Sequence, residues 1–172
     1  MAICLKDVIA SGELVLHARS GNPAALVDFA TQWWPVIGRI AWSMLGNVSQ
    51  AIAVTEEVLC TALDSCRPLE FPAGYAMVRD AIWLAIVRRR SRRSPPEART
   101  PLFELLDTLD NFDRAAWLLR DIEGLTAADA AAVLETSQNG IKQRARRARV
   151  VLTRAVLQTS SLGIAFFQRR SA

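Results

Sequence analysis

The sequence contains few residues that interrupt helices and no long apolar run. Among its 172 residues are 8 Gly and 7 Pro, and the stretches between them are rich in Ala, Leu and Arg. Such stretches favour helices over strands and turns. No segment approaches the roughly 18 to 20 apolar residues of a membrane span, and the first residues do not have the pattern of a secretory signal. We therefore expect an all-α protein that lies in the cytoplasm.

Residues typical of metal sites and of catalysis are also scarce. The only histidine is His17, and the three cysteines, Cys4, Cys60 and Cys66, are too few and too irregularly spaced for a disulfide framework or a zinc site. There is no glycine-rich phosphate loop, and no Ser or Cys lies in the sequence context of a nucleophile. The sequence thus predicts no metal, no cofactor and no enzymatic activity.

Charge is abundant but unevenly distributed. The hydrophobic fraction of 51% and the charged fraction of 22% indicate a folded chain. Residues 1–87 carry a net charge of −3 and residues 88–172 a net charge of +7, with no acidic residue after Glu135. Basic residues concentrate in residues 88–93 and 142–149. Such clusters attract a polyanion, although a solvated helix face remains an alternative interpretation of each.

Apolar spacing predicts four helices in the first half of the chain. One contains Leu14, Val15 and Ala18 and ends near Gly21, and a second covers residues 23–45. Its expected buried residues are Leu26, Phe29, Trp33, Ile37, Ile40 and Trp42, and Pro35 is a candidate for a kink. A third helix is expected from an N-cap at Ser49 to Ala62, and a fourth from Pro72 to the arginine run, burying Met77, Val78, Ile82 and Ile86.

A proline-rich segment separates this half from the next. Residues 91–101 (SRRSPPEARTP) combine two adjacent prolines with charged and small polar residues. Such a segment neither continues a helix nor packs into a core. We therefore predict two small helical domains, residues 1–93 and 102–160, joined by a linker at residues 94–101 and followed by an apolar and basic tail at residues 161–172.

The second domain contains a helix-turn-helix pattern. Helices are expected at residues 102–109, 114–121, 126–134 and 138–158. Thr126 and Asp129 form an acidic variant of a capping box, and residues 135–137 form the turn. The last helix can bury Ile141, Ala145 and Ala148. This geometry places the last helix in the DNA major groove, although a helical hairpin with solvated arginines remains an alternative.

The stretch LLRDIEGLTAADAAAVLETSQNGIKQRARRAR, residues 118–149, resembles the promoter-reading region of extracytoplasmic-function sigma factors. Residues 13–29 resemble the first helix of that family, and Trp34-Pro35, Ile40-Ala41 and Leu45-Gly46 resemble its second. Residues 57–59 stand where the family has its core-binding helix. Residues 71–90 correspond to the helix that opens the minus-ten element. The resemblance extends to about residue 157 and implies a transcription initiation factor that binds RNA polymerase core enzyme and double-stranded promoter DNA.

The resemblance also assigns residues to each role. For the minus-thirty-five element, the implied DNA-binding residues are Thr126, Ser137, Gln138, Asn139, Lys142, Gln143, Arg144, Arg146, Arg147 and Arg149. Within this set, Ser137, Gln138, Asn139 and Gln143 are candidates for contacts to base edges. For the minus-ten element, the implied DNA-binding residues are Tyr75, Arg79, Trp83, Arg88, Arg89 and Arg90. The implied polymerase-binding residues are Val54, Glu56, Glu57, Val58 and Leu59.

The sequence departs from the family in both domains. Residues 50–53 (QAIA) replace an acidic segment, and Pro72, Gly74, Ala81, Ala85 and Ile86 replace polar or aromatic residues of the melting helix. In the turn, Glu135 stands in place of a usual Gly and Thr136 in place of a usual Ile. These departures keep two other interpretations open: a sigma-like decoy that binds an anti-sigma factor, and a regulator that uses only its helix-turn-helix.

The family does not account for the tail. Leu162, Ile164, Phe166 and Phe167 make it apolar. One hypothesis is that the tail folds back across the groove between the two domains, and the other is that it binds a regulator or the polymerase.

Overall fold

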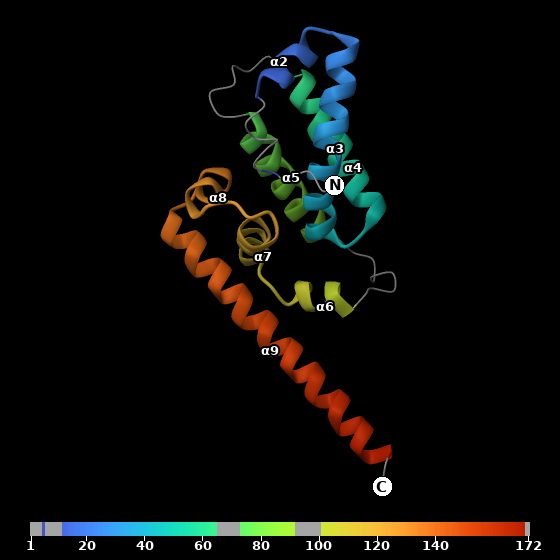
Figure 1. Ribbon diagram of the computed structural model, residues 1–172, viewed down its shortest axis with the longest axis vertical. Coiled ribbons are helices and arrows are strands. Elements are labelled where there is room, and N and C mark those ends of the chain that lie inside the picture. Colours follow the sequence, from blue (N-terminus) through green and yellow to red (C-terminus); the bar gives the residue numbers. More distant parts are fainter. Residues whose placement is uncertain (1–4, 6–11, 65–72, 92–100, 171–172) are drawn as a thin grey trace.

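The computed structural model describes residue 5 and residues 12–64, 73–91 and 101–170, and the side chains of most of them. Every element in these ranges is a helix, which confirms the expected all-α fold. Figure 1 shows α2 to α5 grouped in the upper part, α8 beside α5, α7 and α6 lower down, and the long α9 running diagonally from α8 to the bottom of the view. The expected linker at residues 94–101 lies outside the described residues except for Pro101.

The first group consists of α2 (Gly12–Arg19), α3 (Pro23–Leu45), α4 (Val48–Asp64) and α5 (Ala73–Arg90). The α3 helix has the predicted bounds because both of its ends are capped. The Asn22 side chain accepts hydrogen bonds from the amides of Ala24 and Ala25, and Gly46 ends the helix with a left-handed φ of 65°. Pro35 lies inside α3.

Two local predictions for this group are wrong. The α4 helix begins at Val48, and its N-cap is Asn47, whose side chain accepts a hydrogen bond from the amide of Gln50. Asn is as favourable an N-cap residue as Ser. The helix therefore begins after Asn47, two residues before the predicted N-cap Ser49. Trp42, expected in the core, is 41% exposed and instead packs edge-on against Phe103 with 4.8 Å between ring centroids.

The second group consists of α6 (Pro101–Asp107), α7 (Asn111–Trp117), the π-helix η1 (Leu118–Ile122), α8 (Ala127–Val133) and α9 (Gln138–Arg170). The helix expected at residues 114–121 begins earlier because Asp110 caps it, its side chain accepting from the amide of Phe112. It then widens into η1, and Gly124 takes a φ of 67° before α8.

The tail does not fold back across the groove between the groups, so that hypothesis is wrong. The backbone of α9 continues as one helix to Arg170. Figure 1 shows this helix extending far beyond the other elements. No proline interrupts residues 138–170, so nothing removes a backbone donor from the helical hydrogen-bond ladder.

One hydrophobic core joins the two groups. Its buried members include Trp33 and Ile37 of α3, Ile82 of α5, Leu119 of η1 and Ile141 of α9. The residues predicted as buried in α5 and α9 are confirmed: Met77, Val78, Ile82, Ile86, Ile141, Ala145 and Ala148. The helix-turn-helix therefore packs directly on the first group.

Candidate nucleic-acid interface

Two capped helices and a short turn form the helix-turn-helix. Thr126 begins α8 in a capping box, in which its hydroxyl accepts from the amide of Asp129 at 3.1 Å and the Asp129 carboxylate accepts from the amide of Thr126 at 3.4 Å. Ser137 begins α9, its hydroxyl accepting from the amide of Gly140 at 3.0 Å. Both residues, expected to contact DNA, thus have a structural role in starting a helix.

The start of α9 presents a polar face. Ile141, Ala145 and Ala148 point into the protein and are at most 1% exposed. The opposite face is exposed and carries the other candidates for base and phosphate contacts: Gln138, Asn139, Lys142, Gln143 and Arg146. Amide and basic side chains are the groups that read base edges and bind phosphates in the major groove.

Three arginines of α9 are paired with carboxylates of the same group. Arg147 donates to both oxygens of Asp113, at 2.8 and 3.0 Å, and Arg144 donates to the same carboxylate at 3.3 Å. Arg149 donates to both oxygens of Asp121, each at 2.8 Å. These hydrogen bonds raise the pKa of Arg147 and of Arg149 above the ordinary value. Within the described part of the chain, Lys142 and Arg146 form no ion pair.

The minus-ten candidates of α5 face the second group of helices. The Tyr75 hydroxyl donates to Asp129 at 2.8 Å, and Arg79 pairs with Glu135 at 2.5 Å. The Trp83 ring packs edge-on against Phe112, with 5.4 Å between centroids. The departures at Ala81, Ala85 and Ile86 are fully buried, so these three side chains serve the core.

The arginine run at the end of α5 is partly engaged in the fold. Arg88 pairs with Glu57 of α4 at 2.5 Å. Arg89 pairs with Asp107 of α6 at 3.1 Å and donates to the carbonyl of Met44. Arg90 is exposed. The structure thus places one of the three candidate arginines on the open surface.

Three of the five predicted polymerase-binding residues lie in the core. Val54, Val58 and Leu59 are buried, because the helical period turns them toward α3 and α5. Glu56 and Glu57 are exposed. The outer face of α4 also exposes Val48 and Ile52, which stand eight and four residues before Glu56. Of the predicted set, only the two glutamates are therefore exposed, and Glu57 is paired with Arg88.

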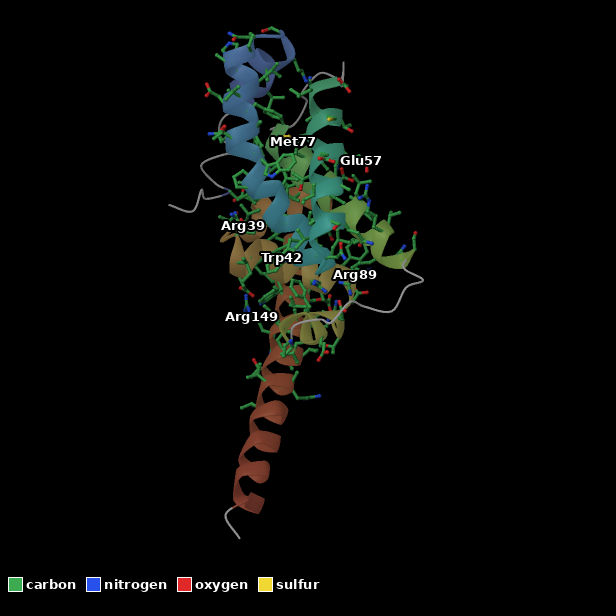
Figure 2. All side chains as sticks on the ribbon, turned by 90° about the vertical axis from the view of Figure 1, so that its right-hand side faces the viewer. Arg39, Trp42, Glu57, Met77, Arg89 and Arg149 are labelled. Atoms are coloured by element: carbon green, nitrogen blue, oxygen red, sulfur yellow. The ribbon has the colours of Figure 1, made fainter. Side chains whose placement is uncertain are left out.

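The strongest polar contacts between the two groups involve residues that the sequence did not single out. Arg39 of α3 donates to both oxygens of Glu123, each at 2.7 Å, and the Glu123 side chain is only 2% exposed. Arg114 of α7 is also buried and binds the carbonyl of Ser43 and the carboxylate of Asp107. In Figure 2, Arg39, Trp42 and Arg89 lie at the level where the two groups meet.

Burial shifts the pKa values of Arg114 and Tyr75 in opposite directions. Removal from water, together with the charge of Arg89, lowers the pKa of Arg114 to about 9. Removal from water and the hydrogen bond to Asp129 raise the pKa of Tyr75 to about 12. The shifted pKa values of Arg114 and Tyr75 are therefore consequences of the contact between the two groups of helices.

Glu135 has an unusual backbone conformation in the turn. Its φ is 50°, and it is the only residue besides glycine with a positive φ among the described residues. This left-handed region costs an ordinary residue about 1 kcal/mol relative to glycine. A glutamate thus occupies a position that favours glycine, and its carboxylate pairs with Arg79.

The ionisation of Tyr75 gives a pH prediction. Because the pKa of Tyr75 is raised from 10.0 to about 12, the stabilising hydrogen bond to Asp129 is complete below pH 10 and is lost as the pH rises to about 12. Tyr75 is the only tyrosine, so ultraviolet absorbance of tyrosinate measures this titration directly. Replacement of Asp129 with alanine is expected to move the midpoint part of the way toward 10, because burial of the ring remains; an unchanged midpoint would contradict the contribution of Asp129.

The described residues hold no cluster of metal ligands and no helix long and apolar enough to cross a membrane. The site consists of a short turn between two helices, an exposed polar face at the start of the second helix, and basic side chains around that face. This combination is the geometry of a helix-turn-helix, carried on a larger helical body.

Comparison with known proteins assigns this part of the chain to a family. Residues 99–152 match the family described as sigma-70, region 4. No curated protein sequence matches the chain. Among solved structures, CnrH in complex with the cytosolic domain of CnrY is similar with a TM-score of 0.69 and 23% identity, over 87% of this chain and 98% of that one.

A second similar structure is the sigma factor RpoE in complex with the anti-sigma factor NepR from Bartonella quintana. Its TM-score is 0.61 and its identity 18%, over 76% of this chain and 96% of that one. At these identities the likeness shows a shared fold. The region 4 match over residues 99–152 and this shared fold agree with the resemblance of the sequence to extracytoplasmic-function sigma factors.

Proposed function

We propose that this protein directs RNA polymerase core enzyme to specific promoters and reads the minus-thirty-five element with the start of α9. The observation that carries the proposal is the exposed polar face of α9 within the region that matches sigma-70 region 4. Gln138, Asn139 and Gln143 are placed to reach base edges, while Lys142 and Arg146 are free to meet phosphates. In this role the protein acts in the cytoplasm, by binding and without catalysis.

The first group of helices supplies the other contacts of this proposal. The exposed face of α4, with Ile52, Glu56 and Glu57, is the candidate surface for the polymerase. The face of α5 with Tyr75, Arg79 and Trp83 is the candidate for the minus-ten element, since aromatic rings stack on unpaired bases. Both fold relatives are solved in complex with another protein. An anti-sigma factor is therefore a further candidate partner.

Transcription with purified components tests this function. We expect run-off transcripts from genomic fragments when the protein is added to core polymerase, and none from core polymerase alone. Exchange of Glu56 for lysine is expected to reduce the transcripts by weakening polymerase binding, and it leaves the ion pair between Glu57 and Arg88 in place. If no promoter fires while the protein still binds an anti-sigma factor, it is a decoy and the proposal is wrong.

Two substitutions in α9 separate positioning from sequence reading. Replacement of Arg146 with alanine removes an exposed cation, so binding to all duplexes is expected to weaken and the salt slope to fall by about 0.9. Replacement of Asn139 with alanine is expected to reduce the preference for the promoter over other duplexes, with the salt slope unchanged. Fluorescence anisotropy at several salt concentrations measures both. Identical effects of the two changes would contradict the assignment.

A further inference from the structure

The cations at the start of α9 differ in how they are held. Lys142 and Arg146 are exposed and form no ion pair within the described part of the chain. Arg144 and Arg147 are three residues apart, so they lie on the same side of α9, and both donate to Asp113 of α7. One carboxylate of α7 therefore binds two cations of the helix that carries the candidate DNA contacts.

Arg144 and Arg147 lie along one edge of the exposed face of α9. The helical period places both between that face and the buried face, which is formed by Ile141, Ala145 and Ala148. Their side chains are 33% and 59% exposed, so a ligand can reach them. A helix that lies in the major groove has a phosphate backbone along each side, and edge cations are the ones that meet it.

Asp113 holds these two arginines in a fixed direction. Arg147 donates to the carboxylate through Nε and Nη2, at 3.0 and 2.8 Å, and this pair of parallel bonds fixes the plane of the guanidinium. Arg144 donates to Oδ1 at 3.3 Å, and its guanidinium lies 5.2 Å from the centroid of the Phe112 ring. The Asp113 side chain is only 13% exposed, so the packing around it limits its movement with the arginines.

Cations in a fixed position respond differently to matched and unmatched duplexes. On a matched duplex, base contacts seat α9 in the groove, and the phosphates come to the arginines where Asp113 holds them. On an unmatched duplex the helix is not seated, so an arginine must extend to reach the backbone. Extension breaks its charge-assisted hydrogen bonds to Asp113, and their loss opposes the contact.

We propose that Asp113 is a specificity-determining residue of the helix-turn-helix, which withholds Arg144 and Arg147 from duplexes that do not match the preferred sequence. It acts through the two arginines and is therefore a positioning residue. The inference rests on the proposed function, in which the start of α9 reads DNA.

A change of one carboxylate to its amide tests the inference. Asp113→Asn removes the charge that holds the arginines and keeps the size of the side chain. The matched control is Glu104→Gln on α6, at a carboxylate that pairs with no residue of α9 among the described residues. Both variants gain one positive charge, so the general attraction to DNA rises in both proteins.

Fluorescence anisotropy is measured with two duplexes, one of random sequence and one selected from a random pool by the unaltered protein. We expect Asp113→Asn to bind the random duplex about fivefold more tightly than Glu104→Gln does, with a salt slope steeper by about 1.8, because two more phosphates are neutralised. We expect the two variants to bind the selected duplex equally, to within about twofold, because seated arginines already meet phosphates.

Two results would overturn the inference: equal gains on both duplexes, which indicate a general charge effect, and random-duplex binding equal to the control. A double-mutant cycle separates the arginines from the local charge. When Arg144→Ala and Arg147→Ala are present in both proteins, Asp113→Asn is expected to give no gain over Glu104→Gln. A gain that survives the loss of both arginines contradicts the proposed role of Asp113.

A second variant is measured if Asp113→Asn fails to fold by circular dichroism. Arg147→Lys keeps the charge of the helix, but an ammonium group cannot form the two parallel bonds to Asp113. We expect it to bind the random duplex about twofold more tightly than the unaltered protein, without a gain on the selected duplex. Unchanged binding to the random duplex would count against the inference.

The binding assays contain no polymerase, so a failure to initiate transcription appears only in the run-off assay. A protein that selects no duplex from the pool would contradict the proposed reading of DNA, and the inference with it. A protein that selects a duplex, but whose Asp113→Asn variant gains equally on both duplexes, would contradict the inference alone.

Discussion

Replacement of Arg114 with alanine is expected to lower the free energy of unfolding by about 3 kcal/mol. The Arg114 side chain is 1% exposed and donates to the carbonyl of Ser43 at 2.9 Å and to Asp107 at 3.0 Å. Its removal leaves the carbonyl without its charged donor and opens a cavity beside Phe103, which the guanidinium faces at 5.9 Å. Urea denaturation followed by circular dichroism measures the change.

Arg146 provides the control for this substitution. It lies in the same group of helices but is exposed and forms no ion pair among the described residues, so its replacement with alanine is expected to change stability by less than about 0.5 kcal/mol. Equal losses for the two variants would show that the buried contact contributes nothing specific to the junction of the two groups.

Replacement of Gly46 with alanine is expected to destabilise the fold by about 2 to 4 kcal/mol. The φ of Gly46 is 65°, and an added Cβ would lie 2.7 Å from Cδ1 of Phe103. That ring cannot move freely, because it is buried against Trp42 on one side and faces Arg114 on another. The substitution therefore combines backbone strain with a steric conflict between α3 and α6.

Gly124 separates these two causes. Its φ is 67°, and no atom lies within 4 Å of an added Cβ. Alanine there is expected to cost only about 1 kcal/mol, from the backbone conformation alone. A loss at Gly46 no larger than the loss at Gly124, measured by urea denaturation, would contradict the proposed contact with Phe103.

The local features of this fold were predictable from the sequence because they depend on neighbouring residues. Asn22 and Gly46 set the bounds of α3, and the capping box at Thr126 sets the start of α8. The spacing of Ile141, Ala145 and Ala148 assigned the inner face of α9 correctly, since burial follows the helical period. The same period predicted that the polar side chains near residue 140 are exposed.

The contacts between the two groups were not predictable in this way. Arg39 and Glu123 are separated by 84 residues, and neither belongs to a local pattern that names the other. The period of α4 could have shown that Val54 and Val58 share an inner face, but the resemblance assigned the segment as a whole to a partner. Clusters of arginine likewise indicate a basic surface without showing which members are neutralised, as Asp113 neutralises Arg147.

The continuity of α9 has a mechanical consequence. Its 33 residues rise about 1.5 Å each, so the helix is about 50 Å long. Its first turns carry the side chains that we propose to contact DNA, and Figure 1 shows the far end well clear of the other helices. If α9 moves as a rigid body, a rotation of about 0.1 radian about its N-terminal end moves its C-terminal end by about 5 Å. Binding of another molecule to the C-terminal end of α9 would therefore rotate the polar face at its N-terminal end without contacting that face.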